Sequence, residues 1–83
     1  MSEQRELGVG ATTTFPTWAA GHLTSLKITN STANGGEITV HAGARSEIVS
    51  VSGNEFKEIK RDWAGIMIAV ANSGNTPLKV QTA

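Results

Sequence analysis

Short segments in which apolar and polar residues alternate, separated by turn residues, determine what this chain can fold into. The clearest example is 22–29, where Thr24, Leu26 and Ile28 fall on one face. The segment 37–42 alternates in the same way. A period of two residues is that of a β-strand with one buried face. Such segments recur at intervals of roughly 8–12 residues, which is typical of an all-β domain.

The residues between these segments favour turns. Asn34 and Gly35 stand between 22–29 and 37–42, and an Asn-Gly pair favours the positive φ angles of a tight hairpin. We therefore predict that these two segments pair with each other as a hairpin. Further breaks are expected at 43–46, 52–54 and 72–77, before a last strand at 78–82.

The segment 65–71 is the most apolar strand of the chain. One face carries Ile66, Ile68 and Val70, and the other carries Met67, Ala69 and Ala71. A strand with two apolar faces is central or covered on both sides. We predict that Met67, Ala69 and Ala71 form part of an interface with another subunit. Trp18, in a loop bounded by Pro16 and Gly21, is a second interface candidate.

The segment 55–64 allows two interpretations. Phe56, Ile59 and Trp63 recur at helical spacing, which predicts one or two helical turns. The run 57–60 also fits a short edge strand, and the even spacing of the neighbouring strands favours this second interpretation.

Together these patterns predict an all-β fold of six to seven short strands. The expected architecture is a small antiparallel β-sandwich or barrel of jelly-roll or immunoglobulin-like type, with a short helix at 55–64 as the alternative. Residues 1–6 are polar and are expected to form a flexible arm before a single domain at 7–83. No internal repeat is convincing, although 23–42 and 65–82 both run strand, Asn/Gly turn, strand.

The charge and size of the chain exclude several classes of function. Seven basic and seven acidic residues among 83 give zero net charge, which argues against nucleic acid and anionic membranes as partners. There is no cysteine and therefore no disulfide to support the small core, so association with copies of the same chain is expected. The polar N-terminus predicts no signal peptide and synthesis in the cytoplasm.

The sequence holds no recognisable catalytic or metal-binding pattern. His22 and His41 are the only histidines, and no Gly-x-Ser-x-Gly motif is present. The histidine and carboxylate spacing matches no metal site, and no glycine-rich phosphate loop occurs. We therefore expect no enzymatic activity and no cofactor. Arg61, Asp62 and Trp63 are candidates for a carbohydrate site, because a tryptophan ring stacks on sugars while polar groups bind hydroxyls.

The second half of the chain has a run from Phe56 through Trp63 to Ile68, followed by a polar Asn-Ser-Gly-Asn-Thr-Pro turn. This pattern, with its Thr, Ala and Gly, resembles small β-sandwich structural proteins of bacteriophage virions. The resemblance implies a capsid, vertex, decoration or spike component, located in the virion and forming symmetric oligomers with its own copies and with other virion proteins. It assigns no functional residue. A lectin-like module that uses Trp18 or Trp63 is the alternative.

Overall fold

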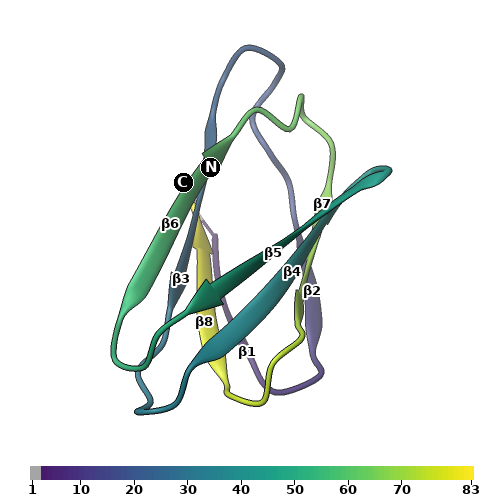
Figure 1. Ribbon diagram of the computed structural model, residues 1–83. Coiled ribbons are helices and arrows are strands. Elements are labelled where there is room, and N and C mark those ends of the chain that lie inside the picture. The colour runs from purple at the N-terminus through teal and green to yellow at the C-terminus, as the bar shows by residue number, and fades with distance from the viewer. Residues whose placement is uncertain (1–2) are drawn as a thin grey trace.

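The computed structural model describes residues 3–83, and every regular element in that range is a β-strand (Figure 1). The strands are β1 (Glu3–Leu7), β2 (Thr12–Phe15), β3 (Thr24–Thr29), β4 (Gly36–Ala42), β5 (Arg45–Val51), β6 (Phe56–Arg61), β7 (Ile68–Asn72) and β8 (Leu78–Thr82). The prediction of an all-β chain is confirmed, with eight strands instead of six or seven. The segment 55–64 contains strand β6, so the helical alternative is wrong.

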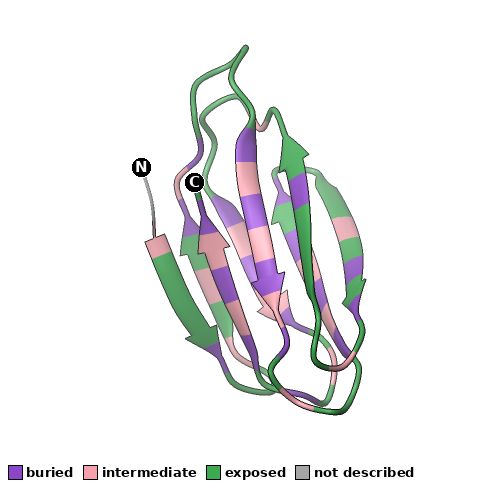
Figure 2. Cartoon of the chain, turned by 90° about the vertical axis from the view of Figure 1, so that its left-hand side faces the viewer, coloured by how far each residue is buried: buried purple, intermediate pink, exposed green. Residues whose placement is uncertain are grey.

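The strands form two four-stranded antiparallel sheets. The first sheet has the order β1-β8-β3-β6, and the second has the order β2-β7-β4-β5. Buried and partly buried residues alternate strictly along the central strands β3, β7 and β8, which Figure 2 shows as bands of purple and pink. The buried faces of both sheets share one apolar core, whose fully buried side chains include Phe15, Leu26, Ile28, Ile38, Val40, Ile68, Val70 and Val80.

The predicted hairpin between 22–29 and 37–42 is wrong. β3 lies between β8 and β6 in the first sheet, whereas β4 lies between β7 and β5 in the second. The connection at 30–35 therefore passes from one sheet to the other. Neither Asn34 nor Gly35 has a positive φ, so the pair does not form the tight turn that its sequence favours.

The turn that does join two paired strands lies between β4 and β5. Gly43 has a φ of 63°, which a glycine adopts without steric cost, and Ala44 completes a two-residue turn. This places Ala42 opposite Arg45. For all the remaining connections between the strands of residues 3–83, the two consecutive strands lie in different sheets.

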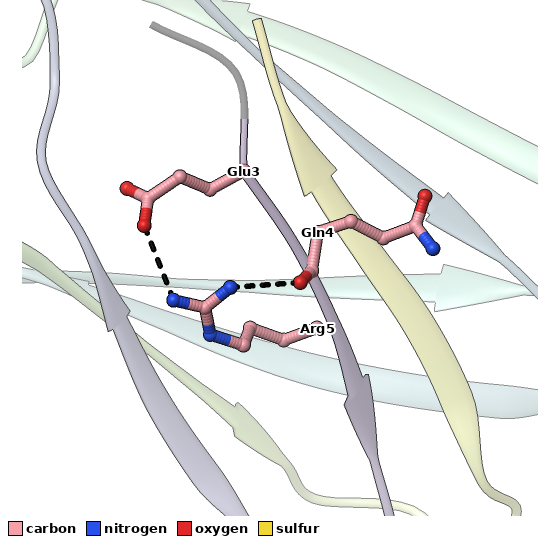
Figure 3. A network of polar contacts seen from close by, with 3 residues as sticks. All are labelled: Glu3, Gln4 and Arg5. Atoms are coloured by element: carbon pink, nitrogen blue, oxygen red, sulfur yellow. Dashed lines mark hydrogen bonds and ion pairs between the residues drawn. The ribbon is translucent and has the colours of Figure 1, made fainter.

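Most of the segment expected to be a flexible arm lies in β1. Glu3–Leu7 pairs with β8 along its whole length, with Glu3 opposite Thr82, while residues 1–2 lie outside the described range. Only Leu7 of this strand is buried, so the sequence carries no alternation that would have indicated it. The Arg5 guanidinium donates hydrogen bonds to the Gln4 carbonyl and to a Glu3 carboxylate oxygen (Figure 3).

Two buried asparagines occupy equivalent places in the two halves of the chain. The side-chain amide of Asn30 donates to the Asn34 carbonyl at 2.6 Å, and that of Asn72 donates to the Thr76 carbonyl at 2.8 Å. Each Oδ1 accepts the N–H of the residue two positions later, which is Thr32 in one case and Gly74 in the other.

The same two side chains also bind the last residue of a strand that is distant in sequence. The Asn30 amide reaches the carbonyl of Val51 at the end of β5, and the Asn72 amide reaches that of Leu7 at the end of β1. Exchanging β1–β4 with β5–β8 converts the strand order of the first sheet into that of the second. The two strand-turn-strand units seen in the sequence are thus related by the topology of the whole chain.

Candidate binding surfaces

Three connections lie toward one end of the molecule: 16–23 and 62–67, at the top of Figure 1, and the β4–β5 turn, at its right. The Thr17 hydroxyl donates to the Ile66 carbonyl at 2.7 Å, which holds the first and last of these loops together. The Gly21 N–H donates to Asp62 Oδ2 at 2.9 Å across the same two loops. A Cβ atom built on Gly43 would lie 3.7 Å from Ile66, so the β4–β5 turn adjoins them.

Asp62 organises the 62–67 loop. Its carboxylate accepts the Gly21 N–H and also the Ala64 N–H at 3.0 Å. These two hydrogen bonds, with a smaller contribution from the charge of His22, hold the pKa of Asp62 below its ordinary value of 3.8. Ala64 and Gly65 then turn the chain with φ angles of 55° and 78°. The carboxylate is therefore already engaged in fixing the loop.

The predicted carbohydrate candidates Arg61, Asp62 and Trp63 line one groove of about 710 Å³. An ion pair between Arg61 and Glu47, with a nitrogen–oxygen distance of 2.7 Å, joins the two sheets there. Trp63 is partly buried and packs against the core. The other lining residues are Val40, Ala42, Ala44, Arg45, Ser46, Glu47, Ala64 and Ile66, which combine an apolar wall with charged groups.

The predicted interface residues are only partly brought together. Trp18 and Met67 are 38% and 57% exposed, and both lie in the two loops that the Thr17–Ile66 hydrogen bond joins. Ala69 and Ala71 are partly buried in β7, between β2 and β4, and do not continue an exposed strip. The strand predicted at 65–71 begins only at Ile68, because the loop bonded to Thr17 and Asp62 includes Ile66 and Met67.

Two further exposed apolar side chains lie in the same two loops. Leu23 is 60% exposed and Ile66 is 41% exposed. We call Trp18, Leu23, Ile66 and Met67 the apolar end. The sequence did carry a signal for Leu23, since it precedes Thr24 and so falls on the face opposite to the buried Leu26 and Ile28. A continuous strand at 65–71 would put Ile66 on the same face as the buried Ile68 and Val70, but β7 begins at Ile68 and Ile66 is exposed in the loop.

The histidines and carboxylates of the described residues are not gathered at one place. Within residues 3–83, no three His, Asp or Glu side chains gather as a metal site would require. His22 lines a small hollow with Trp18, Ala19 and Leu23, whereas His41 is exposed on β4. The same range contains no helix with the length and apolarity of a membrane span.

The geometry defines a small all-β domain with one apolar end and one mixed groove. Residues 7–83 match the family of unknown function DUF8244, and the chain belongs to this family. No curated protein and no solved structure matches the chain.

Proposed function

We propose that this protein is a non-catalytic structural protein that associates with copies of itself through the apolar end. The observation that carries the proposal is the gathering of Trp18, Leu23, Ile66 and Met67 on two loops fixed to each other by hydrogen bonds. Contiguous exposed apolar side chains are typical of protein interfaces, and tryptophan and methionine are enriched there. Fixed loops lose little conformational entropy on association.

The strand order supports a more specific proposal, a β-sandwich of the jelly-roll type. Eight antiparallel strands in the orders β1-β8-β3-β6 and β2-β7-β4-β5 are the arrangement of two Greek keys. Viral capsid domains and lectins use this architecture. We therefore propose a virion component, in agreement with the resemblance of the chain to phage structural proteins. Mass spectrometry of virus particles, purified from a culture that produces this protein, tests the proposal. If the protein is absent from the particles, the virion assignment is wrong.

Self-association is tested by size-exclusion chromatography with light scattering at tens to hundreds of micromolar protein. The wild type is expected to elute as an oligomer, and the double variant W18S/M67S as a smaller species. F56S is the matched control, because Phe56 is a similarly exposed apolar residue, at 62%, on β6. A monomeric wild type, or equal effects of the two variants, contradicts association through the apolar end.

The groove at Arg61, Asp62 and Trp63 favours a second candidate function, carbohydrate binding. Charged groups of Arg45, Glu47 and Arg61 stand beside an indole there, a combination suited to sugar hydroxyls and ring faces. Tryptophan fluorescence in a W18F background reports Trp63 alone. A saturable change on titration with a sugar, lost in R61A, supports this candidate, and no response across a glycan array removes it.

A further inference from the structure

We propose that the free edge of β5 is a second self-association site, where it pairs antiparallel with β5 of another copy. This inference rests on the proposed function only in taking another copy as the partner. β5 is seven residues long and is hydrogen-bonded to β4 alone, at the edge of the second sheet. The pairing would join two second sheets into one continuous sheet of eight strands.

The register of β4 and β5 fixes which backbone groups are free. In a hairpin with a two-residue turn, the pair next to the turn is hydrogen-bonded and the pairs alternate from there. The pair Ala42–Arg45 adjoins the turn, so Ser46, Ile48 and Ser50 direct their N–H and C=O groups away from β4. One bond supports this independently. The Ser73 N–H donates to the carbonyl of Glu37, the residue opposite Ser50, so Glu37 faces β7.

A two-fold pairing centred on Ile48 matches these groups without conflict. Ile48 would lie opposite Ile48 of the second copy, and Ser46 opposite Ser50. Each of these pairs is of the hydrogen-bonded kind, because all three residues present free donors and acceptors at the edge. Ile48 is 65% exposed in one copy, and the pairing would place two such side chains in contact. No like charges face each other in this register.

The other edges are less suited to self-pairing. β2 has only four residues. β1 carries Glu3, Arg5 and Glu6 among its five residues. β6 has four charged residues in six, and the same two-fold arrangement would set Glu58 against Glu58. Charged side chains on an edge strand are the usual protection against pairing. None of Ser46, Ile48 and Ser50, the β5 residues with free backbone groups, is charged.

Disulfide trapping tests this register directly, because the chain has no cysteine. Residues in a hydrogen-bonded antiparallel pair have Cα atoms about 5.5 Å apart, within the range that a disulfide spans. I48C is expected to form a covalent dimer under mild oxidation. S46C and S50C are expected to cross-link when mixed but not separately, since identical positions would lie about 13 Å apart along the strands. F56C is the control for random collision.

A second comparison separates this inference from the proposed function. I48K places like charges opposite each other and should raise the dissociation constant of the β5 contact about tenfold. F56K should leave that constant unchanged. Register-specific cross-links that persist in the W18S/M67S background support the β5 site even where the apolar end fails. An oligomeric wild type whose I48C variant cross-links no faster than F56C overturns the β5 site and leaves the proposed function standing.

Discussion

Asn30 and Asn72 carry hydrogen bonds that the strands themselves cannot provide. Each stands at the end of a buried strand where the chain crosses to the other sheet, and each is almost fully buried. The crossing leaves backbone carbonyls at Val51 and Leu7 to be satisfied by a side chain. The short carboxamide of asparagine carries two N–H donors and a separate carbonyl acceptor, which suits both positions.

Replacing Asn30 by alanine should therefore be costly. N30A removes the donor to the carbonyls of Asn34, Val51 and Ser52 and the acceptor for Thr32, and leaves part of these groups buried without a partner. We expect the free energy of unfolding to fall by about 2–4 kcal/mol in urea denaturation. N34A is the matched control, because Asn34 is exposed and takes part through its backbone. Equal midpoints for the two variants would contradict this role.

Asp62 gives the apolar end a dependence on pH. Its folded-state pKa lies below the ordinary value of 3.8, because the charged carboxylate accepts the N–H groups of Gly21 and Ala64. The ionised form thus stabilises the fold fully above that ordinary pKa, and the stabilisation is lost as the pH falls through the lower folded-state pKa. D62N should be less stable than the wild type at neutral pH, and the difference should vanish in acid.

Thermal unfolding of D62N and the wild type between pH 7 and pH 2 measures this effect. E6Q is the control, since Glu6 is an exposed carboxylate on β1. A difference between D62N and the wild type that is constant with pH would show that the carboxylate charge has no part in fixing the loop.

At the scale of elements, the sequence located strands well and their partners poorly. The alternation at 24–29 and 36–42 directly reflects one buried face, so it is readable without a structure. Pairing depends on where the chain goes after each strand, and the Asn34-Gly35 signal was overridden by the burial of Asn30. β1 could not be predicted, because only one of its residues is buried and its sequence therefore shows no alternation of apolar and polar residues.

The contact between the 30–35 and 52–55 connections allows a sharp test. A Cβ atom added at Gly53 would lie 2.4 Å from the Ala33 carbonyl oxygen. Because that oxygen belongs to the backbone, one of the two connections would have to shift. The adjacent Asn54 N–H donates to Thr32 at 2.7 Å, so that shift would also disturb a hydrogen bond. We expect G53A to lower the free energy of unfolding by about 1–3 kcal/mol. G8A should be near neutral, because nothing lies within 4 Å of its added atom. Equal stabilities would show that the two connections do not pack this closely.

For the molecule as a whole, the candidate surfaces could be predicted only in part. Trp18 and Met67 were identified because large apolar residues stood where no core face was expected for them. Their proximity could not be foreseen, since it depends on a hydrogen bond between residues 49 positions apart. The central position of β7 agrees with its two apolar faces, and Ala69 and Ala71 are only partly buried on its outer face, so their part in an interface stays a prediction.

The relation between the two halves predicts that the chain tolerates circular permutation at its middle. Glu3 lies opposite Thr82, so the first and last residues of the paired strands β1 and β8 are neighbours. A short Gly-Ser linker can therefore join them, as the β4–β5 turn joins β4 to β5. Opening the chain between Gly43 and Ala44 gives the order β5–β8 then β1–β4, which reproduces both strand orders with the sheets exchanged.

We expect this permutant to fold with a free energy of unfolding within about 2 kcal/mol of the wild type, since loop tips tolerate new termini. Opening the chain between Thr32 and Ala33 should lower the free energy of unfolding further. The Thr32 carbonyl accepts the Asn54 N–H there, and the Asn34 carbonyl accepts the Asn30 side-chain amide. Circular dichroism and urea denaturation compare the two permutants. If both are equally stable, the stability does not depend on the crossing connections. If the middle permutant alone fails, the two halves are not interchangeable in folding, whatever the symmetry of their strand order.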